Sequence, residues 1–241
     1  MSISSETLFH FTTKFEYLKS ILSDGFHPRY CREYAWGGYD FAVPMTCFCD
    51  IPLSQILNHT DTYGGYGIGI KKKLARENGI TPVMYIANDS KLFNQVDYKI
   101  RSIGNGQKEY DINDFLLLHY IKKVRGESIH NIDGNKKKGQ VTFYNEREWR
   151  YIPKNYVFSN DYRPVFLDRN EVFNKDEYNN KTKGYELKFS IEDISYIIIK
   201  TEADRDRTIK AIKKIFFDKS EEEQLLLASR ILSLKQIEED F

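Results

Sequence analysis

The segment Phe143–Tyr151 holds the residues of this chain best suited to chemistry, because carboxylates, arginines and aromatic rings follow one another closely. Read as a β-strand, it sends Glu146 and Glu148 to one face, since strand side chains alternate with period 2. Two carboxylates one pleat apart raise the pKa of one of the pair, which can then serve as an acid, a base or a ribose ligand. The alternative is a solvated edge strand whose Glu and Arg side chains screen each other.

A strand followed by a helix is predicted near the start of the sequence, with a histidine near the end of the strand. Leu8–Thr12 reads as a short strand with His10 near its end, and a helix is predicted to begin at Thr13. The helix has an apolar stripe at helical spacing, made of Phe15, Leu18, Ile21 and Leu22. The alternative for His10 is a hydrogen-bonded histidine of the core.

Two further segments have the composition of a ligand site. Residues 27–43 form a polar and aromatic stretch, which is expected to be an irregular loop. Such a loop can cover a ligand, and the alternative is a surface loop with stacked aromatic rings. In the predicted strand Tyr63–Ile70, three alternating glycines (Gly65, Gly67 and Gly69) share one face. A face without side chains lets another backbone or a flat ligand approach closely.

The remaining segments predict an α+β fold with a helical C-terminus. A helix is expected over residues 111–124, with His119 on its surface, followed by a polar loop over 125–140. Later come strands at Tyr185–Phe189 and Ser195–Lys200 and an amphipathic helix at Ala203–Phe217, and a last helix starts after Ser220. We expect one domain over residues 1–241, with a core at about 6–200 and C-terminal helices at about 203–236.

Composition limits the possible functions. The 241 residues are 41% hydrophobic and carry a formal net charge of +1, so no global field favours nucleic acid or a membrane. We find neither a signal peptide nor a membrane span, and a cytoplasmic protein is expected. The three cysteines predict reduced thiols, and the five scattered histidines predict no metal site.

Several of these segments together resemble the AbiGi family of bacterial abortive-infection proteins, which act in phage resistance. That family is usually described as the partner, or antitoxin, of a toxin in a two-gene system. The resemblance covers most of residues 8–153 and the strand and helix at 196–215. Its segments are Leu8–Gly25, Cys47–Pro52, Tyr63–Ile70 with Pro82–Ile86, and Asn145–Pro153.

The same segments are more distantly similar to ADP-ribosyltransferases. This resemblance implies a split mixed or antiparallel sheet core with flanking helices, with NAD as substrate and no metal. It makes Glu148 the catalytic carboxylate, and Glu146 would position or activate the acceptor. The chain departs from the pattern because the middle motif has no Ser-Thr-Ser and the helix that normally follows it is unclear.

The resemblance also implies the residues that bind NAD. His10 and Thr12 match the first-strand histidine motif, and Tyr63 and Tyr66 are candidates for the aromatic residue that stacks on nicotinamide. Arg29, in the polar and aromatic stretch, is a further expected contact.

Two hypotheses of different classes follow. In the first, the chain is an anti-phage ADP-ribosyltransferase that binds NAD and transfers ADP-ribose to a protein or nucleic acid. In the second, it is a non-enzymatic antitoxin or regulator that binds a cognate toxin, operator DNA or a phage component. Against operator DNA, the sequence contains no helix-turn-helix signature with a basic recognition helix.

Overall fold

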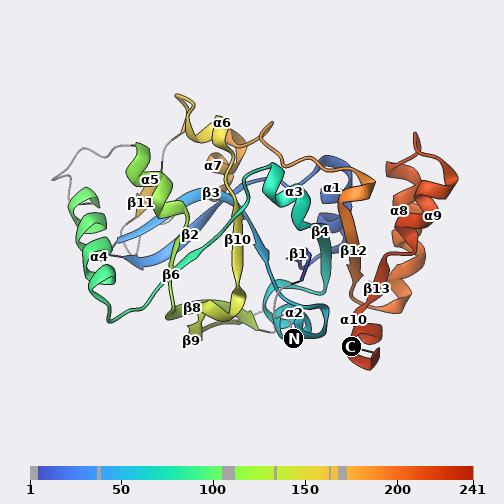
Figure 1. Ribbon diagram of the computed structural model, residues 1–241, viewed down its shortest axis with the longest axis horizontal. Helices are drawn as coiled ribbons and strands as arrows, with labels where there is room; N and C mark the ends of the chain where they lie inside the picture. Colours follow the sequence, from blue (N-terminus) through green and yellow to red (C-terminus); the bar gives the residue numbers. More distant parts are fainter. Residues whose placement is uncertain are drawn as a thin grey trace.

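A mixed β-sheet organises the chain, as the computed structural model shows for residues 5–36, 39–104, 112–132, 135–162, 164–167 and 173–240 (Figure 1). Its strand order is β13-β12-β4-β1-β3-β10-β5, and β2 and β11 also pair with β3. All pairings in this sheet are antiparallel except the parallel pair β12 and β13. The strands are β1 (Thr7–Thr12), β2 (Arg29–Trp36), β3 (Tyr39–Cys49), β4 (Tyr66–Lys71), β5 (Thr81–Pro82), β10 (Glu148–Tyr151), β11 (Val165–Leu167), β12 (Ile194–Ile199) and β13 (Ile231–Ser233).

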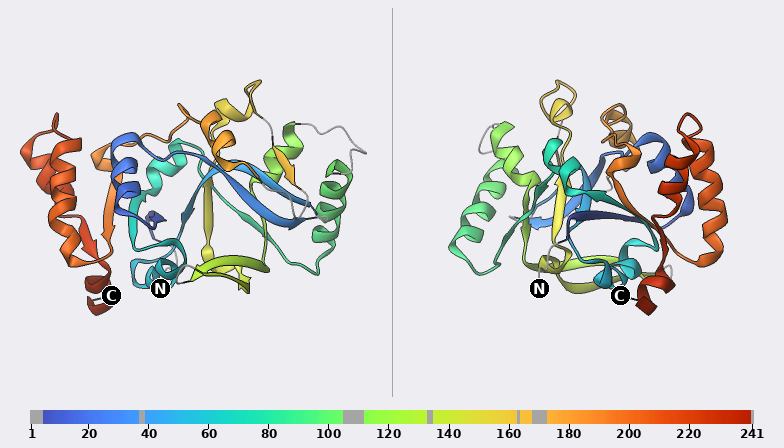
Figure 2. Two further views of the ribbon diagram at one scale, coloured as in Figure 1. Left: turned by 180° about the vertical axis from the view of Figure 1, so that it is seen from behind. Right: turned by 45° about the vertical axis from the view of Figure 1, so that its right-hand side comes forward.

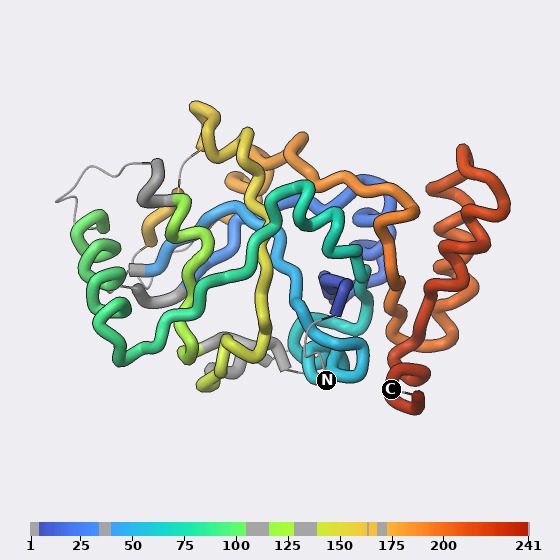
Figure 3. Tube along the Cα trace, in the orientation of Figure 1, coloured from blue at the N-terminus to red at the C-terminus, as the bar shows by residue number. Residues whose placement is uncertain are grey.

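Helices cover both faces of the central strands and extend the molecule at its two ends. In Figure 1 and in the rear view of Figure 2, α8 and α9 lie at one end and α4 at the other. The trace in Figure 3 shows the same separation between the C-terminal segment and α4. The helices are α1 (Phe15–Asp24), α2 (Leu57–Tyr63), α3 (Lys72–Glu77), α4 (Lys91–Gly104), α5 (Ile112–His119), α6 (Lys154–Val157), α7 (Lys175–Lys181), α8 (Arg205–Ile215), α9 (Glu221–Ala228) and α10 (Leu234–Asp240).

The central strands are apolar on both faces because each face is covered. Ile197 and Ile199 of β12 belong to a core cluster with residues of α1, α8 and α9. Ile198, between them, belongs to a second cluster that includes Ile237 of α10. A third cluster joins β2 and β3 to α4 and α6. This arrangement confirms the α+β class and the mixed sheet.

The prediction of an irregular loop over residues 27–43 is wrong. These residues form most of the antiparallel pair β2 and β3, with Arg29 opposite Met45 and Cys31 opposite Val43. Interleaved polar residues hid the strand pattern, although Tyr30 and Phe41 are fully buried in the core. The polar loop predicted over 125–140 is likewise a hairpin, formed by β8 (Arg125–Ile132) and β9 (Asn135–Thr142).

The helix predicted over residues 111–124 is also too long. It ends at His119, and Ile121–Lys123 forms β7, which pairs in parallel with β6 (Met84–Ile86). His119 is fully buried and does not lie on the helix surface. Its Nε2 forms a hydrogen bond of 2.8 Å with the Tyr162 hydroxyl, which satisfies the buried ring. Apolar residues at helical spacing occur both before His119 and after it, so the sequence pattern does not mark where the helix ends and the strand begins.

Two predictions near the C-terminus need correction. Tyr185–Phe189 makes only an isolated bridge, in which Leu187 pairs with Phe26, and no strand. The last predicted helix is interrupted by β13, whose Ile231 and Ser233 are buried against β12. The segment after residue 203 therefore adds a strand to the edge of the sheet. Among the described residues, no helix is both long and apolar enough to cross a membrane.

The glycine face of β4 is filled by neighbouring side chains rather than open to a flat ligand. A Cβ built on Gly67 would lie 2.8 Å from Phe11 Cδ1, and one built on Gly69 would lie 2.9 Å from Phe9 Cε1. These glycines are needed because the aromatic rings of β1 lie across the adjacent strand.

We expect Gly69→Val to lower the free energy of unfolding by about 1–3 kcal/mol, because the buried Phe9 ring cannot move aside. Urea unfolding followed by circular dichroism measures the change. Gly139→Val is the matched control, since a Cβ on Gly139 of β9 meets nothing within 4 Å. Equal stability of the two variants would contradict this account of the β4 surface.

Candidate functional site

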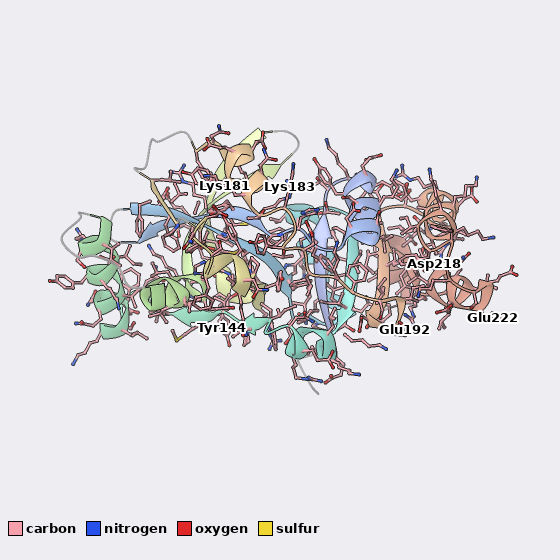
Figure 4. The ribbon with its side chains drawn as sticks, turned by 90° about the horizontal axis from the view of Figure 1, so that it is seen from above. Tyr144, Lys181, Lys183, Glu192, Asp218 and Glu222 are labelled. Atoms are coloured by element: carbon pink, nitrogen blue, oxygen red, sulfur yellow. The ribbon has the colours of Figure 1, made fainter. Side chains whose placement is uncertain are left out.

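A tight turn before β10 places both carboxylates, and the continuous strand predicted for 143–151 is wrong. Phe143–Glu146 is a 3₁₀ turn, and Arg147 adopts a left-handed conformation with φ of 45°. The strand therefore begins at Glu148, which lies opposite Cys49 of β3. Tyr144, labelled in Figure 4, is an exposed residue of this turn. The turn, and not a shared strand face, therefore positions Glu146 near Glu148.

Glu146 and Glu148 meet at one cation. Lys122 Nζ of β7 lies 2.6 Å from Glu146 Oε2 and 2.7 Å from Glu148 Oε2. Lysine side chains that bridge two carboxylates hold them close together despite their like charge.

A second cation, Arg150, lies behind Glu148 and is completely buried. Its Nε donates to Glu148 Oε1 at 2.7 Å, and one terminal nitrogen donates to Glu33 Oε1 of β2 at 2.5 Å. The other terminal nitrogen donates to the His119 carbonyl at 2.7 Å. Three carboxylates therefore share two cations, and β2, β7, β10 and the turn before it are tied together.

This arrangement reverses the pKa shift expected for a carboxylate pair. Burial alone would raise the pKa of Glu148, but Arg150 and Lys122 outweigh it and hold that pKa well below the usual range. Burial likewise opposes the charge of Lys122, yet Glu148, Glu33 and Glu146 raise its pKa well above the usual value. Glu148 is therefore a fixed anion at neutral pH.

A cavity of about 260 Å³ lies in front of these charges. It brings together His10, Tyr63, Glu146 and Glu148, which come from three separate segments of the chain, the two glutamates from one of them. The other lining residues are Phe9, Phe11, Cys31, Arg32, Glu33, Cys47, Phe48, Cys49, His59 and Lys122.

His10 is held in the cavity as a neutral ring. Its Nδ1 lies 2.8 Å from the Cys47 carbonyl, which can only accept, so Nδ1 carries the proton and Nε2 keeps its lone pair. Burial is the main reason that the pKa of His10 is lowered; the bond to Cys47 opposes this and Arg29 adds to it.

Tyr63 forms the aromatic wall of the cavity. Its hydroxyl donates to Glu146 Oε1 at 2.7 Å, and its ring stacks on His59 at 6.1 Å between centroids. Tyr63 as a whole is 41% exposed, so the protein does not enclose this wall of the cavity completely.

The other expected NAD contacts are not among the lining residues. The Tyr66 hydroxyl donates to Asp204 at 3.0 Å and accepts from Arg207 at 2.7 Å, beside α8. Thr12 of β1 pairs with Tyr66 of β4. The charge of Arg29 lowers the pKa of His10, but Arg29 does not line the cavity. Tyr63 is therefore the tyrosine that the fold places at the cavity.

Sequence reasoning missed Lys122, Glu33 and His59 as residues of the site. Lys122 was assigned to a helix and Glu33 to a loop, so neither was expected to face Glu148. Ile121, Lys122 and Lys123 do not alternate between apolar and polar, so no local signal indicates this strand. The described residues contain no group of three His, Cys, Asp or Glu side chains that could hold a metal ion.

Replacing Arg150 tests the dependence of the fold on this network. Arg150→Met leaves Glu148 and Glu33 without a shared buried cation, and we expect the free energy of unfolding to fall by about 3–5 kcal/mol. Lys210→Met is the control, because the Lys210–Asp206 pair is 75% and 77% exposed. Urea unfolding should show little change for the control; an equally small change for Arg150→Met would contradict the prediction.

Acid titration tests the lowered pKa of Glu148. In the unfolded chain this carboxyl takes up a proton near its ordinary pKa of 4.5, whereas in the folded chain it stays ionised. Because the unfolded state then binds more protons, the contribution of Glu148 is complete above pH 4.5 and is lost as the pH falls. The stability difference between wild type and Glu148→Gln should shrink between about pH 5 and pH 3. Urea unfolding over this range measures it, and a constant difference would contradict the shift.

Comparison with known proteins places the chain among phage-resistance proteins. A family model described as "Putative abortive phage resistance protein AbiGi, antitoxin" matches residues 25–200. The "Abortive phage resistance protein AbiGi" of Lactococcus lactis subsp. cremoris is 30% identical over 232 residues, covering 84% of this chain and 90% of the relative. No solved structure matches, so the ADP-ribosyltransferase-like fold stays a prediction.

Proposed function

The chain belongs to the AbiGi family of abortive phage resistance proteins, and we propose that its cavity binds NAD and supports ADP-ribosyl transfer in this defence. One observation carries the proposal: three separate segments of the chain line a single cavity with His10, Tyr63 and the pair Glu146 and Glu148. The transfer breaks the bond between nicotinamide and ribose C1′, and an acceptor nucleophile forms the new bond at C1′ and loses its proton.

Glu148 has the charge that this reaction requires. Ribose C1′ gains positive charge as the glycosidic bond breaks, and a fixed anion in a water-poor site stabilises that charge. Arg150 and Lys122 keep Glu148 ionised and hold its position. Three carboxylates face two cations in this cluster, although burial raises the pKa of Glu33.

His10 and Tyr63 supply the contacts that would orient the substrate. The unprotonated Nε2 of His10 accepts a hydrogen bond from a ribose hydroxyl, and the Tyr63 ring offers a surface for the nicotinamide. The volume of about 260 Å³ is slightly below that of common ligand pockets, about 300–1,000 Å³. The nicotinamide ribose therefore occupies the cavity, and the adenine end extends from it.

A second candidate is a non-enzymatic antitoxin that binds its cognate toxin. The observation that favours it is the bonding of Glu148: Oε1 accepts from Arg150, and Oε2 accepts from Lys122 and, at 3.2 Å, from Arg150. A carboxylate engaged at both oxygens has little capacity left for a substrate. In this role the network supports the fold alone, in line with the antitoxin description of the family.

Glu148→Gln separates the two candidates. For the enzyme, purified wild type should bind NAD in calorimetry, release nicotinamide and label protein or nucleic acid from a bacterial lysate. Glu148→Gln should keep NAD binding but lose about 10²–10³-fold in turnover, the usual effect of removing one charge-stabilising group. Asp206→Asn, at an exposed position of α8, is the control and should match the wild type.

The opposite result supports the antitoxin. It would consist of no NAD binding at millimolar concentration, together with neutralisation of a neighbouring toxin gene by wild type and Glu148→Gln alike. Thermal melting of each variant distinguishes loss of turnover from loss of folding.

A further inference from the structure

Three cysteines line the cavity, and none of them has a part in the proposed chemistry. Cys31 of β2 and Cys47 of β3 are partly buried, and both line the cavity. Their side chains share a hydrogen bond. The third cysteine, Cys49, is buried and donates to the Phe9 carbonyl at 3.4 Å.

The surroundings make the two thiols unequal. The hydrogen bond from Cys47 is the main reason that the pKa of Cys31 is lowered; burial opposes this, and Lys175 and Arg150 add to it. The same hydrogen bond and burial raise the pKa of Cys47, and the Glu148 charge adds to that rise. Burial raises the pKa of Cys49 far above the usual value. Thiolate reactivity follows such environments, so Cys31 is the nucleophile of the three.

We propose that Cys31 and Cys47 are a redox pair, which a peroxide converts into a disulfide across the cavity wall. The Cys31 thiolate attacks one peroxide oxygen, the O–O bond breaks, and the leaving hydroxide takes up a proton to become water. The Cys47 sulfur then attacks the sulfenic sulfur of Cys31, the S–O bond breaks, and a second water leaves with the Cys47 proton. Two thiols are oxidised, and one peroxide is reduced to two waters.

The position of Cys47 couples this step to the rest of the site. Its carbonyl accepts the His10 Nδ1–H bond, and its backbone lies opposite Arg150 in the pairing of β3 with β10. A disulfide of about 2.05 Å is shorter than a thiol hydrogen bond. Its closure therefore draws Cys31 toward the part of β3 that pairs with β10, four residues along the strand from Val43, the pairing partner of Cys31. We infer that oxidation displaces His10 and weakens NAD binding; this second step rests on the proposed function.

Peptide mapping tests the pair without any assumption about NAD. The reduced full-length protein is treated with a small excess of hydrogen peroxide, alkylated, and cleaved with chymotrypsin, which cuts after Phe48 and separates Cys47 from Cys49. Mass spectrometry without reduction should detect a Cys31–Cys47 link that dithiothreitol removes. The link should persist in Cys49→Ser and disappear in Cys31→Ser. In the reduced protein, iodoacetamide should modify Cys31 about tenfold faster than Cys49.

The peptide map and the NAD-binding measurement test different claims, so each can fail without the other. Absence of the link, or a link that includes Cys49, overturns the redox pair. A link that forms while oxidised and reduced protein bind NAD equally overturns the coupling and leaves the pair. If neither form binds NAD, the proposed function has failed and the peptide map still decides the thiol chemistry.

Discussion

A fully buried guanidinium governs much of this structure. Arg150 cannot be taken out of water unless its charge and its donors are satisfied within the protein. Glu148 and Glu33 provide the charge, and the carbonyl that ends α5 provides a further acceptor. The strand β2, the strand β10 and the end of α5 must therefore all reach the same point. The packing around the cavity follows from this electrostatic requirement as much as from apolar burial.

The network also determines what the cavity can do. Lys122 joins the Arg150 cluster to Glu146, and Glu146 in turn holds the Tyr63 hydroxyl. The charged and aromatic walls are thus parts of one connected set of contacts. Such a set is preorganised, which is the property required of a site that stabilises developing charge. The same connections serve equally well to make a rigid surface for a protein partner.

Sequence patterns predicted the parts of the fold that local signals control. The apolar stripe of α1 was correct, since Leu18 and Leu22 are buried and Phe15 and Ile21 pack beside them. The strand at 195–200 and the following helix were also found. The β2–β3 pair was missed because its stability comes from contacts with distant helices, which a polar and aromatic stretch does not reveal.

Only part of the candidate site was predicted, because some of its residues lack a local sequence signal. His10, Tyr63, Glu146 and Glu148 each lie in a recognisable segment, and the fold brings them together. Lys122 could not be found because its role depends on a parallel pairing of β7 with β6 and on a left-handed residue at Arg147. Neither long-range pairing nor a single positive φ has a clear local signal in the sequence.

The strand order has a consequence for how the protein is made. β1 leaves the ribosome before its neighbours β3 and β4, and β13 can pair with β12 only after the other strands of this sheet have been made. Until residues 231–233 are synthesised, the nascent chain exposes an apolar strand edge of the kind that pairs with other chains. A fragment that stops before residue 231 would therefore leave the edge of β12 unpaired, whereas with β13 in place the sheet ends at a strand of three residues.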